Sequence, residues 1–327
     1  MRVLVTGATG KVGNALTQRL VARGDHVVAL ARDPAAAAMM LPEEVEIAHG
    51  DVTDPESLRF AAAGVEAAFN CMGVFEQWAD PDLFNRVNAE GARNVAAASR
   101  EAGAKRLVHT STIDVFDAPR GGTVTEARVA TYEKGTAYER SKQLAERLLL
   151  AEAGAGDDGI EVVMVNPAAI LGPGPWAAGG IDDTISELLR GRMPFAPPGG
   201  MSMTWVGDAA DAHIAALERG TPGERYLVTG GYASVRDICR VAVEEAGRGR
   251  VPLPLPERAA RALSRGGEVL AARTGRPPLL AGGQLEFLLW EARADSGKAR
   301  SELGIEPLDW REAVRRTTRW ILESGRI

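Results

Sequence analysis

The stretch MRVLVTGATGKVG at residues 1–13 decides the fold of this chain. Its apolar run from Arg2 to Thr6 predicts a buried strand that stops at Gly7. The glycines at 7, 10 and 13 predict a tight turn, and the amphipathic run to Arg23 predicts a helix that starts there. This order is typical of a dinucleotide site, because the free N–H groups at the helix start attract a pyrophosphate. The spacing is G-x-x-G-x-x-G, and its position directly after a strand strengthens an otherwise weak motif.

Composition excludes several classes of protein. The 327 residues suffice for one large or two closely joined domains, and 45% hydrophobic with 25% charged residues is typical of a soluble globular protein. A net charge of -6 gives no electrostatic reason to expect nucleic acid or an anionic membrane as partner. Cys71 and Cys239 lie far apart in no metal-type spacing, which favours a reduced, cytoplasmic protein. We expect no signal peptide and no membrane span, since the chain starts on a strand and no apolar run is long enough.

Strand-like and helical runs alternate through the first half of the chain. This alternation predicts an α/β fold, a doubly wound parallel Rossmann sheet with helices on both faces and ligand at the carboxyl ends of the strands. The further strands expected are His26–Ala31, Val45–Ala48, Ala67–Cys71, Arg106–Thr110 and Glu161–Val165, and the long helices are Asp80–Gly103 and Tyr138–Ala153.

The character of the sequence changes after Pro167. Loop-rich segments follow, and from Ser234 onward the pattern is mostly helical. We therefore expect a dinucleotide-binding Rossmann domain over 1–167, to which about 204–230 returns. A smaller, mostly helical substrate-binding lobe would comprise 168–203 and 231–327. Within the returning segment a strand from Thr204 runs into a helix that we expect Asp208 to cap.

The end of the second strand bears on the choice of cofactor. A guanidinium at Arg32 suits the 2′-phosphate of NADP, and Lys11 in the glycine loop could add positive charge. The alternative is NAD, with the Asp33 carboxylate on the ribose 2′-hydroxyl and Arg32 merely solvated. The sequence favours NADP. Asp51, after the third strand, could accept a hydrogen bond from the adenine amine or cap the helix that starts near Pro55.

The segment Tyr138-Glu-Arg-Ser-Lys142 carries the candidate chemistry. Its Tyr and Lys stand four residues apart, so both side chains point from one face of a helix. A phenol has a reference pKa near ~10, and a nearby ammonium and an oxidised nicotinamide would bring that pKa toward the working range. The hydroxyl run Thr110-Ser111-Thr112, at the end of the fifth strand, could hold the substrate oxygen.

At these residues the chain resembles the extended short-chain dehydrogenase/reductase family. The resemblance covers nearly the whole chain. Its branch is closest to the dihydroflavonol reductases and 3β-hydroxysteroid dehydrogenases, since Asn166-Pro167 lacks the arginine that usually precedes this point in sugar-nucleotide epimerases and dehydratases. The matching segments are Thr6–Gly13, Gly50–Val52, His109–Thr112, Tyr138 with Lys142, Asn166–Pro173 and Trp205–Ala212.

The resemblance implies roles for individual residues. Tyr138 would be the acid/base, Lys142 its helper, and Thr112 the group that orients the substrate carbonyl, although Ser111 and Thr110 are adjacent. The family often has His-x-Ala where this chain has Asn70-Cys71-Met72-Gly73, so this segment departs from the family pattern. The cofactor residues implied are Gly7, Thr9, Gly10, Lys11, Val12, Gly13, Arg32, Asp51, Val52, Cys71, Met72, Thr110, Tyr138, Lys142 and Pro167, and Asn88 matches a family asparagine.

The leading hypothesis is an NADP(H)-dependent oxidoreductase that transfers hydride between nicotinamide and a carbonyl or secondary alcohol of a fairly apolar small molecule. One alternative is an NAD-dependent nucleotide-sugar epimerase or dehydratase, and a third is a non-catalytic dinucleotide sensor, which typically lacks the Tyr/Lys pair. The chain could form a homodimer through the Tyr138 helix and the long helix before it, or stay monomeric. Candidate pocket residues are Phe75, Trp78, Phe116, Trp176, Phe195 and Met201, and candidate diphosphate ligands are Arg190, Arg192 and Arg236.

Overall fold

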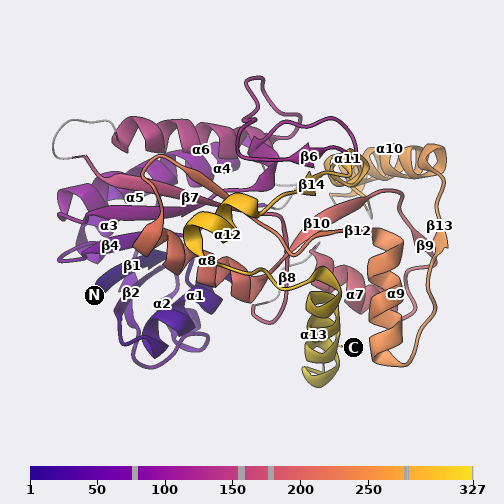
Figure 1. Ribbon diagram of the computed structural model, residues 1–327, viewed down its shortest axis with the longest axis horizontal. Helices are drawn as coiled ribbons and strands as arrows, with labels where there is room; N and C mark the ends of the chain where they lie inside the picture. Colours follow the sequence, from indigo (N-terminus) through magenta and orange to yellow (C-terminus); the bar gives the residue numbers. More distant parts are fainter. Residues whose placement is uncertain (76–79, 154–158, 176–179, 276–277, 279, 326) are drawn as a thin grey trace.

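A seven-stranded parallel sheet forms the centre of the chain, in the order β11-β7-β5-β4-β1-β2-β3 (Figure 1). The computed structural model describes residues 1–75, 80–153, 159–175, 180–275, 278, 280–325 and 327. The predicted fold class is confirmed. The strands are β1 (Arg2–Thr6), β2 (His26–Ala31), β3 (Glu46–His49), β4 (Ala67–Asn70), β5 (Arg106–Thr110), β7 (Glu161–Pro167) and β11 (Arg225–Val228).

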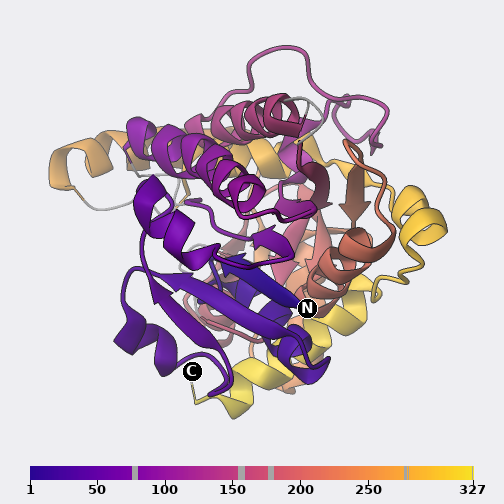
Figure 2. The same ribbon diagram turned by 90° about the vertical axis from the view of Figure 1, so that its left-hand side faces the viewer.

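Helices cover both faces of this sheet, and each face has its own apolar core. Val3, Val5 and Phe69 point toward one core, while Leu4 and Ala68 point toward the other, as the two-residue period of a strand requires. The first core receives side chains from α1 (Lys11–Ala22), α2 (Pro34–Ala38), α8 (Val206–Arg219) and α12 (Gly297–Leu303). The second receives them from α3 (Pro55–Ala61), α5 (Gly91–Glu101) and α6 (Ala137–Ala153), and Figure 2 shows α5 and α6 on the upper side of the sheet.

The long helix expected over 80–103 is divided into three parts. It comprises α4 (Pro81–Phe84), a π-helical segment at Asn85–Glu90, and α5. The π-helical segment contains Asn88, a residue that is 1% exposed. Such a local widening changes which side chain points inward without breaking the helix, so an apolar pattern does not reveal it.

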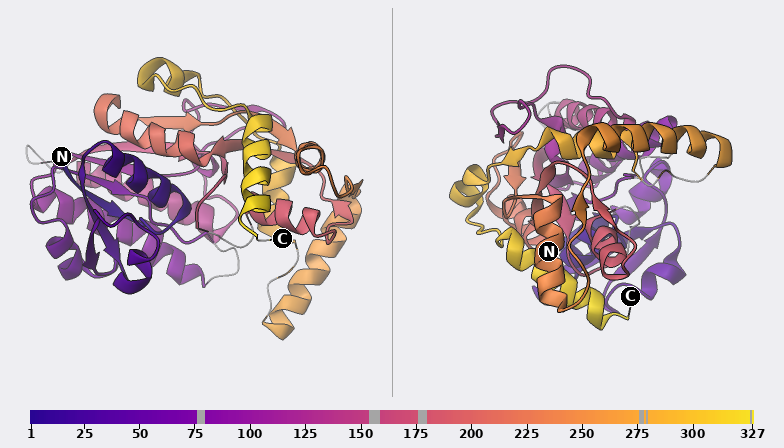
Figure 3. Two further views of the ribbon diagram at one scale, coloured as in Figure 1. Left: turned by 90° about the horizontal axis from the view of Figure 1, so that it is seen from below. Right: turned by 90° about the vertical axis from the view of Figure 1, so that its right-hand side faces the viewer.

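A second layer of structure follows the sheet. β8 (Ala169–Leu171), β10 (Gly200–Trp205) and β12 (Tyr232–Ser234) form a small sheet that packs with α7 (Ile181–Leu189), α9 (Val235–Ala246) and α13 (Trp310–Glu323). The short pairs are β9 (Phe195–Ala196) with β13 (Leu253–Pro254) and β6 (Thr123–Val124) with β14 (Arg293–Ala294). α10 (Glu257–Thr274) packs on α11 (Gly282–Trp290) and projects from the body of the molecule (Figure 3). The domain boundaries expected from the sequence stay a prediction.

The expectation that Asp208 caps α8 is wrong. The helix begins at Val206 after Trp205, which provides no side-chain cap, so Asp208 lies in the first turn. Its carboxylate instead accepts a hydrogen bond from the Leu308 backbone N–H at 2.7 Å. Partial burial raises the pKa of Asp208 to about 6.

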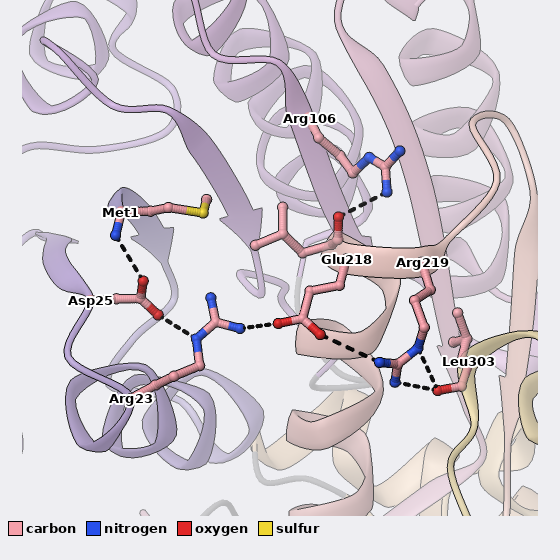
Figure 4. Close-up of polar contacts among 8 residues, drawn as sticks. Met1, Arg23, Asp25, Arg106, Glu218, Arg219 and Leu303 are labelled. Carbon is pink, nitrogen blue, oxygen red and sulfur yellow. Dashed lines mark hydrogen bonds and ion pairs between the residues drawn. The ribbon is translucent and has the colours of Figure 1, made fainter.

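A polar network ties the amino terminus to elements that are distant in sequence (Figure 4). Asp25 accepts from the Met1 amino group at 3.0 Å and from Arg23 at 2.7 Å, and Arg23 continues to Glu218 at the end of α8. Arg219 then donates to the Leu303 carbonyl at the end of α12. The network therefore connects the start of the first strand to the ends of α1, α8 and α12.

None of the helices in the described ranges is long and apolar enough to cross a membrane.

Candidate active site

The glycine loop between β1 and α1 is shaped by close backbone contacts. Gly7 has a φ of +71°, and a Cβ there would lie 2.7 Å from the backbone of Cys71 and Met72. A Cβ at Gly13 would lie 2.1 Å from the Gly7 carbonyl oxygen, so any side chain would force α1 away from the strand. Gly10 precedes the helix and supplies no side-chain cap. The first N–H groups of α1 therefore lack a side-chain acceptor, as a pyrophosphate site requires.

Lys11 leaves this loop and contacts the second layer. Its ammonium forms an ion pair with Asp182 of α7 and donates to the Gly172 carbonyl at 2.9 Å. The Lys11 and Asp182 side chains are 15% and 5% exposed. The positive charge that the sequence offered to a phosphate is thus already paired, and Lys11 connects the glycine loop to the segment after β8.

Arg32 and Asp33 have different surroundings at the end of β2. Arg32 is exposed, and no side chain in the described ranges pairs with it. Asp33 is the N-cap of α2 and accepts from the Ala36 N–H at 3.0 Å. Asp51 accepts from the Thr53 N–H and hydroxyl, both at 2.8 Å, through one oxygen, while Asp54 caps α3. Of the two roles considered for Asp51, the helix cap therefore belongs to another residue.

The segment that departs from the family pattern has structural partners. Asn70 accepts from the Thr6 hydroxyl at 2.7 Å, and its amide contacts His109 Nδ1 at 3.1 Å. Asn88 accepts from the Val74 N–H at 2.7 Å and donates to the Val74 carbonyl at 2.9 Å and to Ser141 at 3.0 Å. Burial raises the pKa of the Cys71 thiol to about 12, which removes it as a nucleophile at neutral pH.

The three hydroxyls after β5 point to three different partners. Thr110 bonds to His213 at 2.6 Å on one side of the sheet, and Ser111 donates to the buried Glu146 at 2.5 Å. Thr112 is 6% exposed, and its hydroxyl interacts with the phenol of Tyr138. Of the three hydroxyls, that of Thr112 is therefore the one that influences Tyr138, and Thr112 stays the predicted residue that orients the substrate.

Lys142 lies one helical turn after Tyr138 on α6. It is 3% exposed and donates to the Thr110 carbonyl at 2.9 Å, and a Cβ at Gly73 would lie 3.4 Å from its nitrogen. Burial lowers the pKa of Lys142 to about 8, although Glu146 and Cys71 oppose this shift. The half-buried ring of Tyr138 packs edge-on against Phe84 at 6.4 Å. Tyr138 and Lys142 of α6 and Thr112 after β5 thus meet at the carboxyl ends of β4 and β5.

The structure adds an acidic residue that the sequence analysis missed. Asp114 accepts from the Thr112 hydroxyl at 2.9 Å, and its other carboxylate oxygen is buried without a partner. Burial, with a contribution from Glu139, raises the pKa of Asp114 to about 6. Burial and the charge of Asp114 in turn raise the pKa of Tyr138. The sequence shows an Asp two residues after Thr112, but it does not show that this Asp is buried.

The aromatic and methionine residues expected around the substrate differ in how deeply they are buried. Phe116 is fully buried in a cluster with Ile113 and Val115, while Phe75 and Phe195 are 44% and 50% exposed. Met201 packs against the core of the second layer. Trp78 and Trp176 lie outside the described residues. Within the described ranges no cluster of three metal-ligating side chains occurs.

The chain is similar to several known proteins in sequence and in fold. Residues 3–229 match the NAD dependent epimerase/dehydratase family. Sterol demethylase protein B of Methylococcus capsulatus is 34% identical over 333 residues, covering 100% of each chain. A putative dihydroflavonol 4-reductase of Synechocystis is 28% identical over 334 residues, covering 99% of this chain and 95% of that one. The structure of a Thermus thermophilus UDP-glucose 4-epimerase complexed with NAD has a TM-score of 0.77 at 23% identity, covering 100% of both chains, and shows the shared fold.

The family match spans more than half of the chain, and a relative above 30% identity spans all of it. The resemblance inferred from the sequence is therefore confirmed. A nicotinamide dinucleotide is the cofactor of this family, and the glycine loop fits it. The chain belongs to the NAD dependent epimerase/dehydratase family, within the extended short-chain dehydrogenases/reductases, and is an NAD(P)-dependent oxidoreductase.

Proposed function

We propose that this chain interconverts a carbonyl group and a secondary alcohol on a fairly apolar small molecule with NADP(H). The observation that carries the proposal is the convergence of Thr112, Tyr138 and Lys142 at one end of the sheet, where ligands bind in open α/β folds. A dinucleotide sensor would not need this set of side chains. Their presence therefore supports an enzyme that moves a proton together with a hydride.

Each of the three residues has a distinct task. Tyr138 gives a proton to the carbonyl oxygen during reduction and takes it back during oxidation. Thr112 donates a hydrogen bond that orients the same oxygen. The Lys142 ammonium stabilises the phenolate form of Tyr138, whose pKa is otherwise raised by burial. The bound nicotinamide supplies or accepts the hydride.

The substrate class rests on the apolar cluster formed by the residues that follow Thr112 in the chain. Phe287 and Trp290 of α11 pack with Ile113 and Phe116, directly after Thr112 in the chain. Trp290 is fixed by a hydrogen bond from its indole to the Ala118 carbonyl at 2.8 Å. A relative named for sterol demethylation supports an apolar substrate as well. In contrast, Arg190 and Arg192 both pair with Glu187, so they do not form a free diphosphate clamp.

The preference for NADP rests on Arg32. Its guanidinium is exposed and unpaired among the described residues, whereas one oxygen of Asp33 is already used as a helix cap. A charge-assisted bond of an arginine to a phosphate contributes roughly 1.5–3 kcal/mol. Arg32→Ala is therefore expected to weaken NADPH binding by about 10- to 100-fold and to leave NADH binding within about twofold.

Fluorescence titration with NADPH and NADH measures how Arg32→Ala changes the affinity for each nucleotide. Arg258→Ala is the matched control, since Arg258 is also exposed and unpaired among the described residues but belongs to α10. Equal effects of Arg32→Ala on NADPH and NADH would contradict the assignment to the 2′-phosphate.

The reaction itself is tested by assaying the purified protein with a panel of ketones and aldehydes, after checking for retained nucleotide. We expect NADPH oxidation with at least one apolar ketone and no tightly retained NAD. Retained NAD together with turnover of a nucleotide sugar would overturn the proposal and assign the epimerase alternative.

A further inference from the structure

Asp114 is a buried acid that the proposed reaction does not use. It lies in the short 3-10 turn at Ile113–Val115, the residue is 9% exposed, and its carboxylate contacts Thr112. One carboxylate oxygen accepts from the Thr112 hydroxyl at 2.9 Å, and the other has no partner although it is buried. An unpaired buried oxygen is costly, so its presence beside reacting groups calls for a functional explanation.

The Thr112 hydroxyl has one proton, so it can donate only one hydrogen bond at a time. In the structure that proton is donated to Asp114, while the Asp114 backbone N–H donates to the same oxygen at 3.3 Å. A hydroxyl whose proton is given to a carboxylate cannot donate it to a substrate carbonyl. A protonated Asp114 would donate to the Thr112 oxygen instead, and the threonine proton would be free to turn.

We propose that Asp114 is a positioning residue whose protonation turns the Thr112 hydroxyl toward the substrate oxygen. With Asp114 ionised, Thr112 is held as a donor to the carboxylate, and a negative charge lies beside the oxygen on which charge develops. With Asp114 neutral, Thr112 donates to that oxygen and the repulsion is gone. Both directions of the reaction share one transition state, so the neutral form is the more active one in each direction.

The charged groups around Asp114 allow it to titrate near neutral pH. Glu139 on α6 faces it and opposes its ionisation, while Lys134 favours ionisation. Lys134 is 9% exposed and stacks over the Trp290 ring of α11 at 4.4 Å, so the opposing charge is itself held in place. Burial is the largest effect and keeps the acid neutral to a higher pH than an exposed aspartate.

A pH–rate comparison tests this mechanism, and this first experiment rests on the proposed carbonyl reduction. Asparagine at position 114 has nearly the shape of aspartic acid and donates at every pH. We expect the ratio of kcat/KM for Asp114→Asn to that of the unchanged protein to rise by at least about tenfold between pH 5 and pH 8. Asp114→Glu, which restores a carboxyl group, should return a pH profile with a falling limb. A ratio that is constant over this range would overturn the proposal, because a purely structural lesion lowers activity equally at every pH.

A second measurement needs no substrate and separates failure of this inference from failure of the proposed function. In protein carrying 13C-labelled aspartate, the carboxyl resonance that Asp114→Asn removes belongs to Asp114. We expect this resonance to titrate between about pH 5 and 7, and Thr112→Val to raise its midpoint, since the variant removes the donor to the carboxylate. A midpoint below about pH 4.5, or one that Thr112→Val leaves unchanged, would overturn the proposal even if a substrate is found.

Discussion

Tyr138→Phe is expected to lower kcat for carbonyl reduction by about 10³-fold or more, the upper part of the range for a general acid. The substitution removes one oxygen and keeps the ring, whose edge-on contact with Phe84 at 6.4 Å involves no hydroxyl. The Ser141 side-chain hydroxyl donates to the Tyr138 backbone carbonyl at 2.7 Å, and this bond is also unaffected. The fold and the cofactor site should therefore survive the loss of the proton donor.

The measurement is single-turnover NADPH oxidation with a saturating ketone, together with nucleotide titration of the same preparation. Tyr132→Phe is the matched control, because the Tyr132 hydroxyl bonds to Asp117 at 3.0 Å on the surface and does not contact Thr112. We expect cofactor affinity within about twofold of the unchanged protein for both variants. Activity of Tyr138→Phe within tenfold of the unchanged protein would exclude Tyr138 as the acid/base.

The sheet could be predicted closely because its strands are apolar, β-branched runs bounded by turn residues. β2 and β5 begin and end at the predicted residues, and β3 is shifted by one. β2 and β5 are buried on both faces after their first residue, so the run of apolar residues alone sets their length. β3 lies at the edge of the sheet and is exposed at both ends.

Features that depend on packing between distant segments could not be predicted. The role of Asp208 as acceptor for Leu308 requires two segments 100 residues apart to meet. Lys11 likewise acquires its partner, Asp182, from the second layer. The sequence placed Tyr138 and Lys142 on one helix face, but only the fold buries Asp114 beside Thr112 and near Tyr138. Motif reasoning finds groups that are close in sequence, whereas the electrostatics of this site come from groups brought together by the sheet.

Lys142→Met is expected to abolish reduction and at the same time to stabilise the protein without cofactor at pH 7. The pKa of Lys142 is lowered from 10.5 to about 8, mainly by burial. Below pH 8 the lysine is charged in both the folded and the unfolded chain, so the folded state carries the full cost of a buried charge. Between pH 8 and 10.5 the unfolded chain binds a proton that the folded chain has released, so the free energy of unfolding rises with pH.

Methionine has a similar length and no charge, so it removes this cost. The pKa difference corresponds to a free-energy cost of about 3 kcal/mol for the buried charge. Loss of the hydrogen bond to the Thr110 carbonyl lowers stability by about 1 kcal/mol. We therefore expect Lys142→Met to raise the free energy of unfolding by about 2 kcal/mol at pH 7, with the gain shrinking as pH rises above 8. Urea denaturation at several pH values measures it, and Lys105→Met on the exposed side of the same domain should stay within about 0.5 kcal/mol. Destabilisation by Lys142→Met at pH 7 would contradict a buried charge held at a cost, whereas stabilisation with loss of turnover would mean that this charge is retained for the reaction and not for the fold.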